Sequence, residues 1–136
     1  MKEYQLQKAV CKYLDLKNVL YCGSMGGQYQ KFHSQRNKAK ATGYKRGFPD
    51  LFIYEISKIG KKLYCGLAIE LKVGYNKPTN EQNWWCDQLN ERGYKAHICT
   101  GIDEALEVID SYLKGIIEWK LREHFLIVGT KDCFGI

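Results

Sequence analysis

The strongest constraint on the fold is a run over residues 67–73, LAIELKV, in which bulky apolar side chains alternate with Ala68, Glu70 and Lys72. An alternation of period two is typical of a β-strand, whose successive side chains point to opposite faces of the sheet. Glu70 and Lys72 therefore project from the same face. The sequence predicts a carboxylate and an ammonium side by side on an otherwise apolar strand.

A second strand is predicted in the stretch 47–54, GFPDLFIY, which is aromatic and β-branched and follows a Gly and a Pro. It is joined to residues 67–73 through a charged turn, residues 57–62, and this arrangement indicates an antiparallel hairpin. Pairing the two strands would bring Asp50, at the start of the first, near Glu70, toward the end of the second.

Two carboxylates beside a lysine are a combination that suits phosphodiester hydrolysis. Carboxylate oxygens hold Mg²⁺ or Mn²⁺, and the lysine stabilises or orients the attacking hydroxide. An alternative is a solvated ion pair between Glu70 and Lys72, with Asp50 as an ordinary turn residue.

The ordered set Gly47-Phe48-Pro49-Asp50, Glu70-Leu71-Lys72 and Gln82 resembles the pattern of the VRR-NUC (virus-type replication-repair nuclease) family of PD-(D/E)xK nucleases. The resemblance covers roughly residues 3–105. It implies a restriction-endonuclease-like α/β core and a Mg²⁺ or Mn²⁺ cofactor. The implied catalytic residues are Asp50, Glu70, Lys72 and Gln82, and the implied metal ligands are Glu3, Asp50, Glu70 and the backbone carbonyl of Leu71.

An amphipathic helix is predicted over residues 3–15, because its apolar residues recur at spacings of three and four. Glu3 and Gln7 lie one turn apart and can face the same neighbour. In the resemblance they match the N-terminal Glu and Gln that complete the site. Read alone, Glu3 favours the positive end of the helix dipole and Gln7 is solvated.

The excess positive charge lies in one segment. No Asp or Glu occurs between Leu16 and Pro49, whereas seven Lys and Arg residues do, against a formal net charge of +6 for the whole chain. Basic residues with interleaved aromatics suit a nucleic-acid backbone and unpaired bases. A solvated loop is the alternative. The predicted nucleic-acid-binding residues are Lys31, Arg36, Lys38, Lys40, Lys45 and Arg46.

Thr79 and Gln82 form a capping box for a helix that ends at Gly93. Gln82 also begins the apolar face of that helix, so it can reach the Glu70 end of the strand. We expect Trp84 and Trp85 to serve the core rather than a ligand.

A strand at 94–100 and a helix capped by Asp103 complete the pattern, which predicts a mixed central sheet flanked by helices. An apolar run at 125–128 is a further candidate strand, at the sheet edge or in a partner subunit. We expect one domain over residues 1–136. Without an apolar span or a signal-like N-terminus, we expect an intracellular protein. Six scattered cysteines indicate neither a zinc site nor a disulfide framework.

The sequence therefore predicts a metal-dependent, structure-selective DNA endonuclease. Stand-alone members of the family occur in phages and bacteria and are similar in activity to Holliday-junction resolvases, which implies a role in DNA repair and a homodimer that cuts two strands symmetrically. Two alternatives remain open: a sequence-reading restriction-type or RNA-cleaving nuclease, and a non-catalytic nucleic-acid-binding module.

Overall fold

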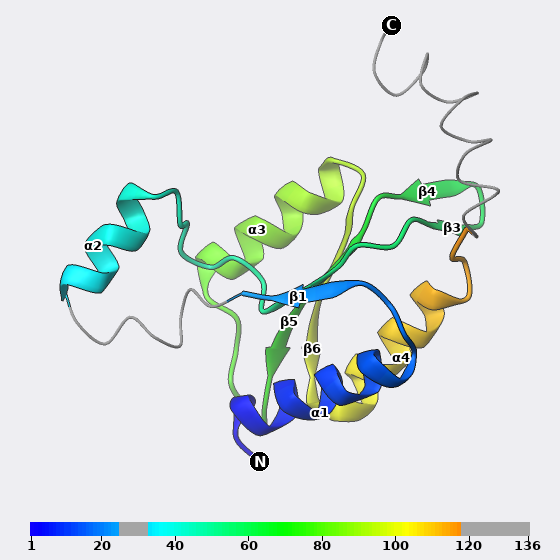
Figure 1. The fold of residues 1–136 in the computed structure, drawn as a ribbon, viewed down its shortest axis with the longest axis horizontal. Helices are drawn as coiled ribbons and strands as arrows, with labels where there is room; N and C mark the ends of the chain where they lie inside the picture. The colour runs from blue at the N-terminus through cyan, green and yellow to red at the C-terminus, as the bar shows by residue number, and fades with distance from the viewer. Residues whose placement is uncertain (25–32, 118–136) are drawn as a thin grey trace, which may run out of the picture.

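The computed structural model describes residues 1–24 and 33–117, and it centres on a four-stranded sheet of order β1-β2-β5-β6 (Figure 1). The two pairs β1–β2 and β2–β5 are antiparallel, whereas β5 and β6 run parallel. The strands are β1 (Tyr21–Gly23), β2 (Leu51–Ile53), β5 (Leu67–Lys72) and β6 (Lys95–Thr100). The predicted mixed sheet is confirmed.

Helices cover both faces of this sheet. On one face, α1 (Glu3–Leu16) and α4 (Gly101–Leu113) pack together and against β5, in a core that includes Leu6, Ile69 and Ile109. On the other face, α3 (Asn80–Glu91) covers β5 and β6 through a smaller cluster around Ala68 and Cys86. Every residue of β5 is buried, so the strand that carries Glu70 and Lys72 is the centre of the fold.

The connection from β2 to β5 is more than the charged turn that was predicted. It forms a second, two-stranded antiparallel sheet of β3 (Ser57–Ile59) and β4 (Lys62–Tyr64), which turns at Gly60 with a φ of 63°. A glycine suits a left-handed turn position, and strands of three residues carry too little apolar alternation to be recognised.

Asp103 does not cap α4, which already begins at Gly101; the carboxylate of Glu104 instead accepts the N–H of Thr100 at 2.8 Å. The predicted strand at residues 125–128 lies outside the described residues. Within the described part of the chain, no helix combines the length and the apolar character that crossing a membrane requires.

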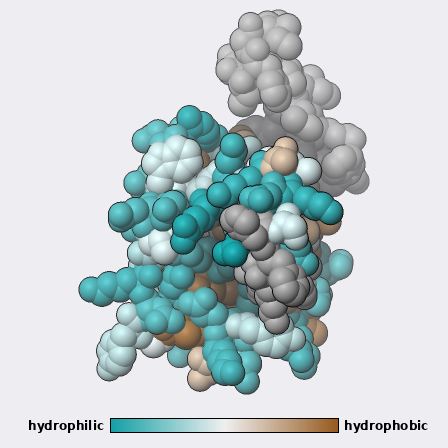
Figure 2. Space-filling view, turned by 90° about the vertical axis from the view of Figure 1, so that its left-hand side faces the viewer, coloured by the Kyte–Doolittle hydropathy of each residue, from teal (hydrophilic) through white to brown (hydrophobic). Residues whose placement is uncertain are grey.

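The basic segment forms a short helix, α2 (His33–Ala41), that stands apart from the sheet and its other helices (Figure 1). Its side chains are exposed from Ser34 onward, apart from the half-buried Ala39. The face of the molecule on this side is covered mostly by hydrophilic residues (Figure 2). The helix thus presents its charge to solvent rather than to the protein's own core.

Candidate active site

Asp50 lies immediately before the first residue of β2. The last residue pair between β2 and β5 is Leu51 with Ile69, and the same register extends to Asp50 opposite Glu70. There the carboxylate Oδ2 of Asp50 accepts a 2.8 Å hydrogen bond from the backbone N–H of Leu71. The N–H and C=O of one strand residue point to the same side. The carbonyl of Leu71 therefore faces the same edge as Asp50.

Glu70 and Lys72 project from one face of β5 as predicted. Their side chains are almost fully buried, and the Lys72 Nζ lies 3.4 Å from Glu70 Oε1. The same ammonium lies 3.8 Å from Oε1 of Glu3, the first residue of α1. Gln7, one turn further along α1, lies beside Gly23, where an added Cβ would be 3.4 Å from its Nε2. The solvated ion pair considered above is excluded for Glu70 and Lys72, because both are buried.

Gln82 performs both of the roles that its position in the sequence indicated. Its side-chain oxygen accepts the N–H of Thr79 at 2.9 Å and so caps α3, while its own backbone N–H donates to the Thr79 hydroxyl oxygen at 3.2 Å. Its Nε2 donates a 2.6 Å hydrogen bond to Oε1 of Glu70. A single side chain thus fixes both the start of the helix and the orientation of the catalytic candidate.

Burial pushes both carboxylates of the site toward the neutral form. Burial, followed by the negative charge of Asp50, raises the pKa of Glu70 to about 8, against the opposing effect of Lys72. Burial likewise raises the pKa of Asp50, opposed by the hydrogen bond from Leu71. Oε2 of Glu70 is buried without a hydrogen-bond partner. A cation placed here would stabilise two carboxylates that the fold alone destabilises.

The donor set fits a hard divalent cation. Carboxylate and carbonyl oxygens are the ligands that Mg²⁺ and Mn²⁺ prefer, and Glu70 Oε2 is a free acceptor of this kind. Within residues 1–24 and 33–117, no group of three or more His, Cys, Asp or Glu side chains is gathered closely enough to hold a metal ion. In this arrangement Lys72 and Gln82 occupy Oε1 of Glu70, and Leu71 occupies Oδ2 of Asp50.

The loop that carries Asp50 is held against α3 by contacts that sequence analysis did not predict. Gly47 has a φ of 89°, and a Cβ at this position would lie 2.7 Å from the backbone of Glu81. Trp85 donates from Nε1 to the carbonyl of Arg46 at 3.1 Å, and its ring meets that of Phe48 edge-on, with centroids 5.1 Å apart. The glycine of the Gly-x-Pro-Asp pattern therefore allows close approach to the helix that supplies Gln82.

The expectation that both tryptophans serve the core is wrong for Trp84, whose side chain is 56% exposed. The ring of Trp84 stands nearly perpendicular to that of Trp85, with centroids 5.6 Å apart. Helical periodicity explains the difference, because the face shared by Gln82 and Cys86 turns Trp84 toward solvent.

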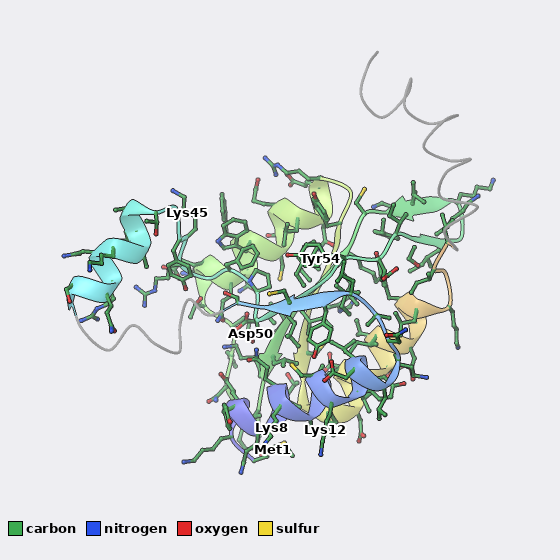
Figure 3. The ribbon with its side chains drawn as sticks, viewed as in Figure 1. Met1, Lys8, Lys12, Lys45, Asp50 and Tyr54 are labelled. Carbon is green, nitrogen blue, oxygen red and sulfur yellow. The ribbon has the colours of Figure 1, made fainter. Side chains whose placement is uncertain are left out.

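The predicted nucleic-acid-binding residues fall into two groups. Arg36, Lys38 and Lys40 lie on α2, whereas Lys45 and Arg46 lie on the loop leading to Asp50 (Figure 3). Lys31 lies outside the described residues.

Tyr44, at the start of that loop, is one of the aromatic residues interleaved with the basic ones. Burial raises the pKa of its phenol, and the charges of Glu70 and Asp50 raise it further, against Arg46. Tyr44 thus lies within electrostatic range of both carboxylates, which no pattern in the sequence indicated.

No protein-family model matches the chain, and no curated protein sequence matches it either. A solved structure described as a "VRR_NUC domain protein" superimposes with a TM-score of 0.70 and 27% sequence identity, over 84% of this chain and 89% of that one. This likeness supports the assignment of the chain to the VRR-NUC family.

The assignment confirms the fold that the resemblance implied, a mixed sheet flanked by helices in the manner of a VRR-NUC nuclease domain. It also gives the cluster around Glu70 a family context. The roles of the individual site residues remain predictions, which the contacts described above make specific.

Proposed function

We propose that this VRR-NUC domain is a metal-dependent DNA endonuclease that selects its substrates by structure. One observation carries the proposal: Asp50, Glu70 and Lys72 meet at one end of β5, with Gln82 bound to Glu70 and Glu3 beside Lys72. Residues from four separate segments of the chain converge there. A structural ion pair would not need two buried carboxylates whose charged forms are both disfavoured.

Asp50, Glu70, Glu3 and the carbonyl of Leu71 are the residues that would hold Mg²⁺ or Mn²⁺. When bound, such an ion supplies charge stabilisation at the phosphate and a more acidic bound water. Lys72 supplies a fixed positive charge for the negative charge that develops at the phosphate in the transition state. Gln82 holds the carboxylate of Glu70 in one orientation, so that the site is preorganised before substrate binds.

The basic residues are proposed to bind the phosphate backbone of DNA. α2 carries its charge away from the body of the domain, and the loop with Lys45 and Arg46 continues from α2 to Asp50. A backbone bound along this path would reach the site directly. Branched DNA such as a four-way junction is the proposed substrate, cut by a homodimer, because one small site cleaves one strand and a two-fold junction matches a two-fold protein.

The test is a cleavage assay on a panel of single-stranded, duplex, flap and four-way-junction DNAs, with RNA of the same sequence as a control. We expect cleavage of branched DNA in Mg²⁺ or Mn²⁺, none in EDTA, and binding without efficient cleavage in Ca²⁺, whose longer and looser coordination suits the reaction poorly. Cleavage confined to one duplex sequence would indicate a restriction-type enzyme. Tight binding with no cleavage of any substrate would indicate a non-catalytic module.

A further inference from the structure

A fully exposed tyrosine stands at the tip of a tight turn directly after the strand that carries the site. Tyr75 has a relative exposure of 102%. The turn is closed by the hydrogen bond from Asn76 N–H to the carbonyl of Val73, at 3.1 Å, and Gly74 adopts the positive φ of 58° that it requires. Tyr75 is the third residue after Lys72, so their Cα atoms are at most about 11 Å apart.

Tyr75 also forms one wall of a cavity of about 690 Å³ at the carboxyl ends of β5 and β6. This volume lies within the range of roughly 300–1,000 Å³ that is usual for small-ligand sites. Val73 and Ile102 line the cavity and are anchored on the core, while Asn76 and Thr100 add polar groups. Thr100 is the β6 partner of Lys72, which places the cavity next to the proposed site.

The chemistry of the lining favours a neutral aromatic ring over a phosphate. No Lys or Arg occurs among the described residues that line the cavity, and Asp103 contributes a carboxylate. An anion would therefore find no cationic side chain in this lining. An exposed aromatic ring beside an apolar floor is suited to stacking on a nucleobase, which every sequence can offer. Lys77, exposed just beyond the turn, can contact the adjoining phosphate.

We propose that this cavity, with Tyr75 as its stacking platform, binds an unpaired nucleobase of the strand whose phosphate lies in the active site. The inference rests on the proposed nuclease function and deepens it. A base held in a double helix is already stacked and cannot enter the cavity. The site thus selects DNA with an unpaired nucleotide close to the cleavage point, such as a flap, an overhang or an open junction.

The test is an abasic scan. A single abasic site is moved one nucleotide at a time through the unpaired region of a substrate that the wild type cleaves, and affinity is measured in metal-free buffer so that no cleavage intervenes. We expect one position at which loss of the base weakens wild-type binding by roughly 5- to 150-fold, the usual range for one stacked base. At that position Tyr75→Ala should show no additional loss, whereas Tyr75→Phe should behave as the wild type.

Tyr54→Ala is the matched control, because Tyr54 is also an exposed tyrosine, 51% accessible, but lies at the opposite end of β2 from Asp50 (Figure 3). It should leave the abasic profile unchanged. A flat abasic profile in a wild type that binds and cleaves DNA would overturn the base-binding inference alone. A profile that is the same in Tyr75→Ala, or an effect of that substitution only on self-association, would also overturn it. Failure of the wild type to bind any DNA would instead remove the proposed function.

Discussion

Gln82 donates a 2.6 Å hydrogen bond to Glu70, and the same side chain accepts the N–H of Thr79 at the start of α3. The helix cap and the site are therefore coupled through one residue. Gln82→Ala should cost about 1 kcal/mol of stability through the lost cap and should also reduce the cleavage rate, because Glu70 loses its orienting partner.

Thr79→Ala separates the two effects. It removes the hydroxyl that accepts the N–H of Gln82 at 3.2 Å but keeps the glutamine side chain. We expect a similar loss of stability, about 0.5–2 kcal/mol, with the cleavage rate nearly unchanged. Thermal unfolding and single-turnover cleavage measure the two quantities. Equal losses of rate in both variants would show that Gln82 acts only as a cap.

Asp50→Asn, Glu70→Gln and Lys72→Ala should each lower cleavage by at least about 100-fold while leaving most DNA affinity intact. These groups stabilise charge that develops in the transition state, so removing one lowers the cleavage rate more than the DNA affinity. Exposed residues of the same types provide matched controls, with Asp87→Asn on α3 and Lys61→Ala in the turn between β3 and β4. Near-normal turnover in any of the three site variants would contradict the assignment.

Glu70→Gln should also raise the stability of the metal-free protein. The folded-state pKa of Glu70 is raised from its ordinary value of 4.5 to about 8, chiefly by burial. Such a group contributes stability that is fully present below pH 4.5 and is lost as the pH rises through about 8. The advantage of the variant in denaturant unfolding should therefore grow over this window. Mg²⁺ should stabilise the wild type more than the variant, and an advantage that shrinks with rising pH would refute the prediction.

The parts of the site that follow from local periodicity were predictable from sequence. Alternation along residues 67–73 placed Glu70 and Lys72 on one face, and the helical spacing of Gln82 placed it toward the sheet. The packing of the loop before Asp50 against α3 was not predictable, because it depends on contacts between Gly47 and a helix more than thirty residues away in the sequence. The short β3–β4 hairpin was missed for lack of a strong apolar pattern, whereas the exposure of Trp84 follows from the helical periodicity of α3.

Gly47→Ala tests this contact between the loop and α3. A Cβ at Gly47 would lie 2.7 Å from the backbone of Glu81, in addition to the strain of a φ of 89°. Gly43 is the matched control, because its φ of 101° carries the same kind of strain with nothing within 4 Å. Gly43→Ala should cost about 1–2 kcal/mol. Gly47→Ala should cost more, and it should also slow cleavage because Asp50 moves with the loop. Equal losses of stability for Gly47→Ala and Gly43→Ala in thermal unfolding would show that the close approach to Glu81 adds no further destabilisation.

The salt dependence of DNA binding tests the basic helix α2. If Lys38 and Lys40 contact phosphates, each contact releases counterions, and its loss should flatten the slope of log affinity against log salt by about 0.9 on duplex DNA. Lys38→Ala with Lys40→Ala should thus reduce the slope by about one to two units. Affinity should fall alike for every DNA sequence. Cleavage at saturating protein and low salt should persist, because neither residue lies in the proposed metal site.

The charge-matched control is Lys8→Ala with Lys12→Ala, which removes two exposed lysines from α1 on the side of the domain away from α2 (Figure 3). Both double variants lower the net charge equally, so a general electrostatic effect would change both slopes to the same extent. Specific phosphate contacts by α2 predict a change only in the Lys38 and Lys40 variant. Measuring affinity for a four-way junction at several salt concentrations decides between these outcomes. A wild-type slope in the α2 variant would remove this helix from the DNA-binding surface.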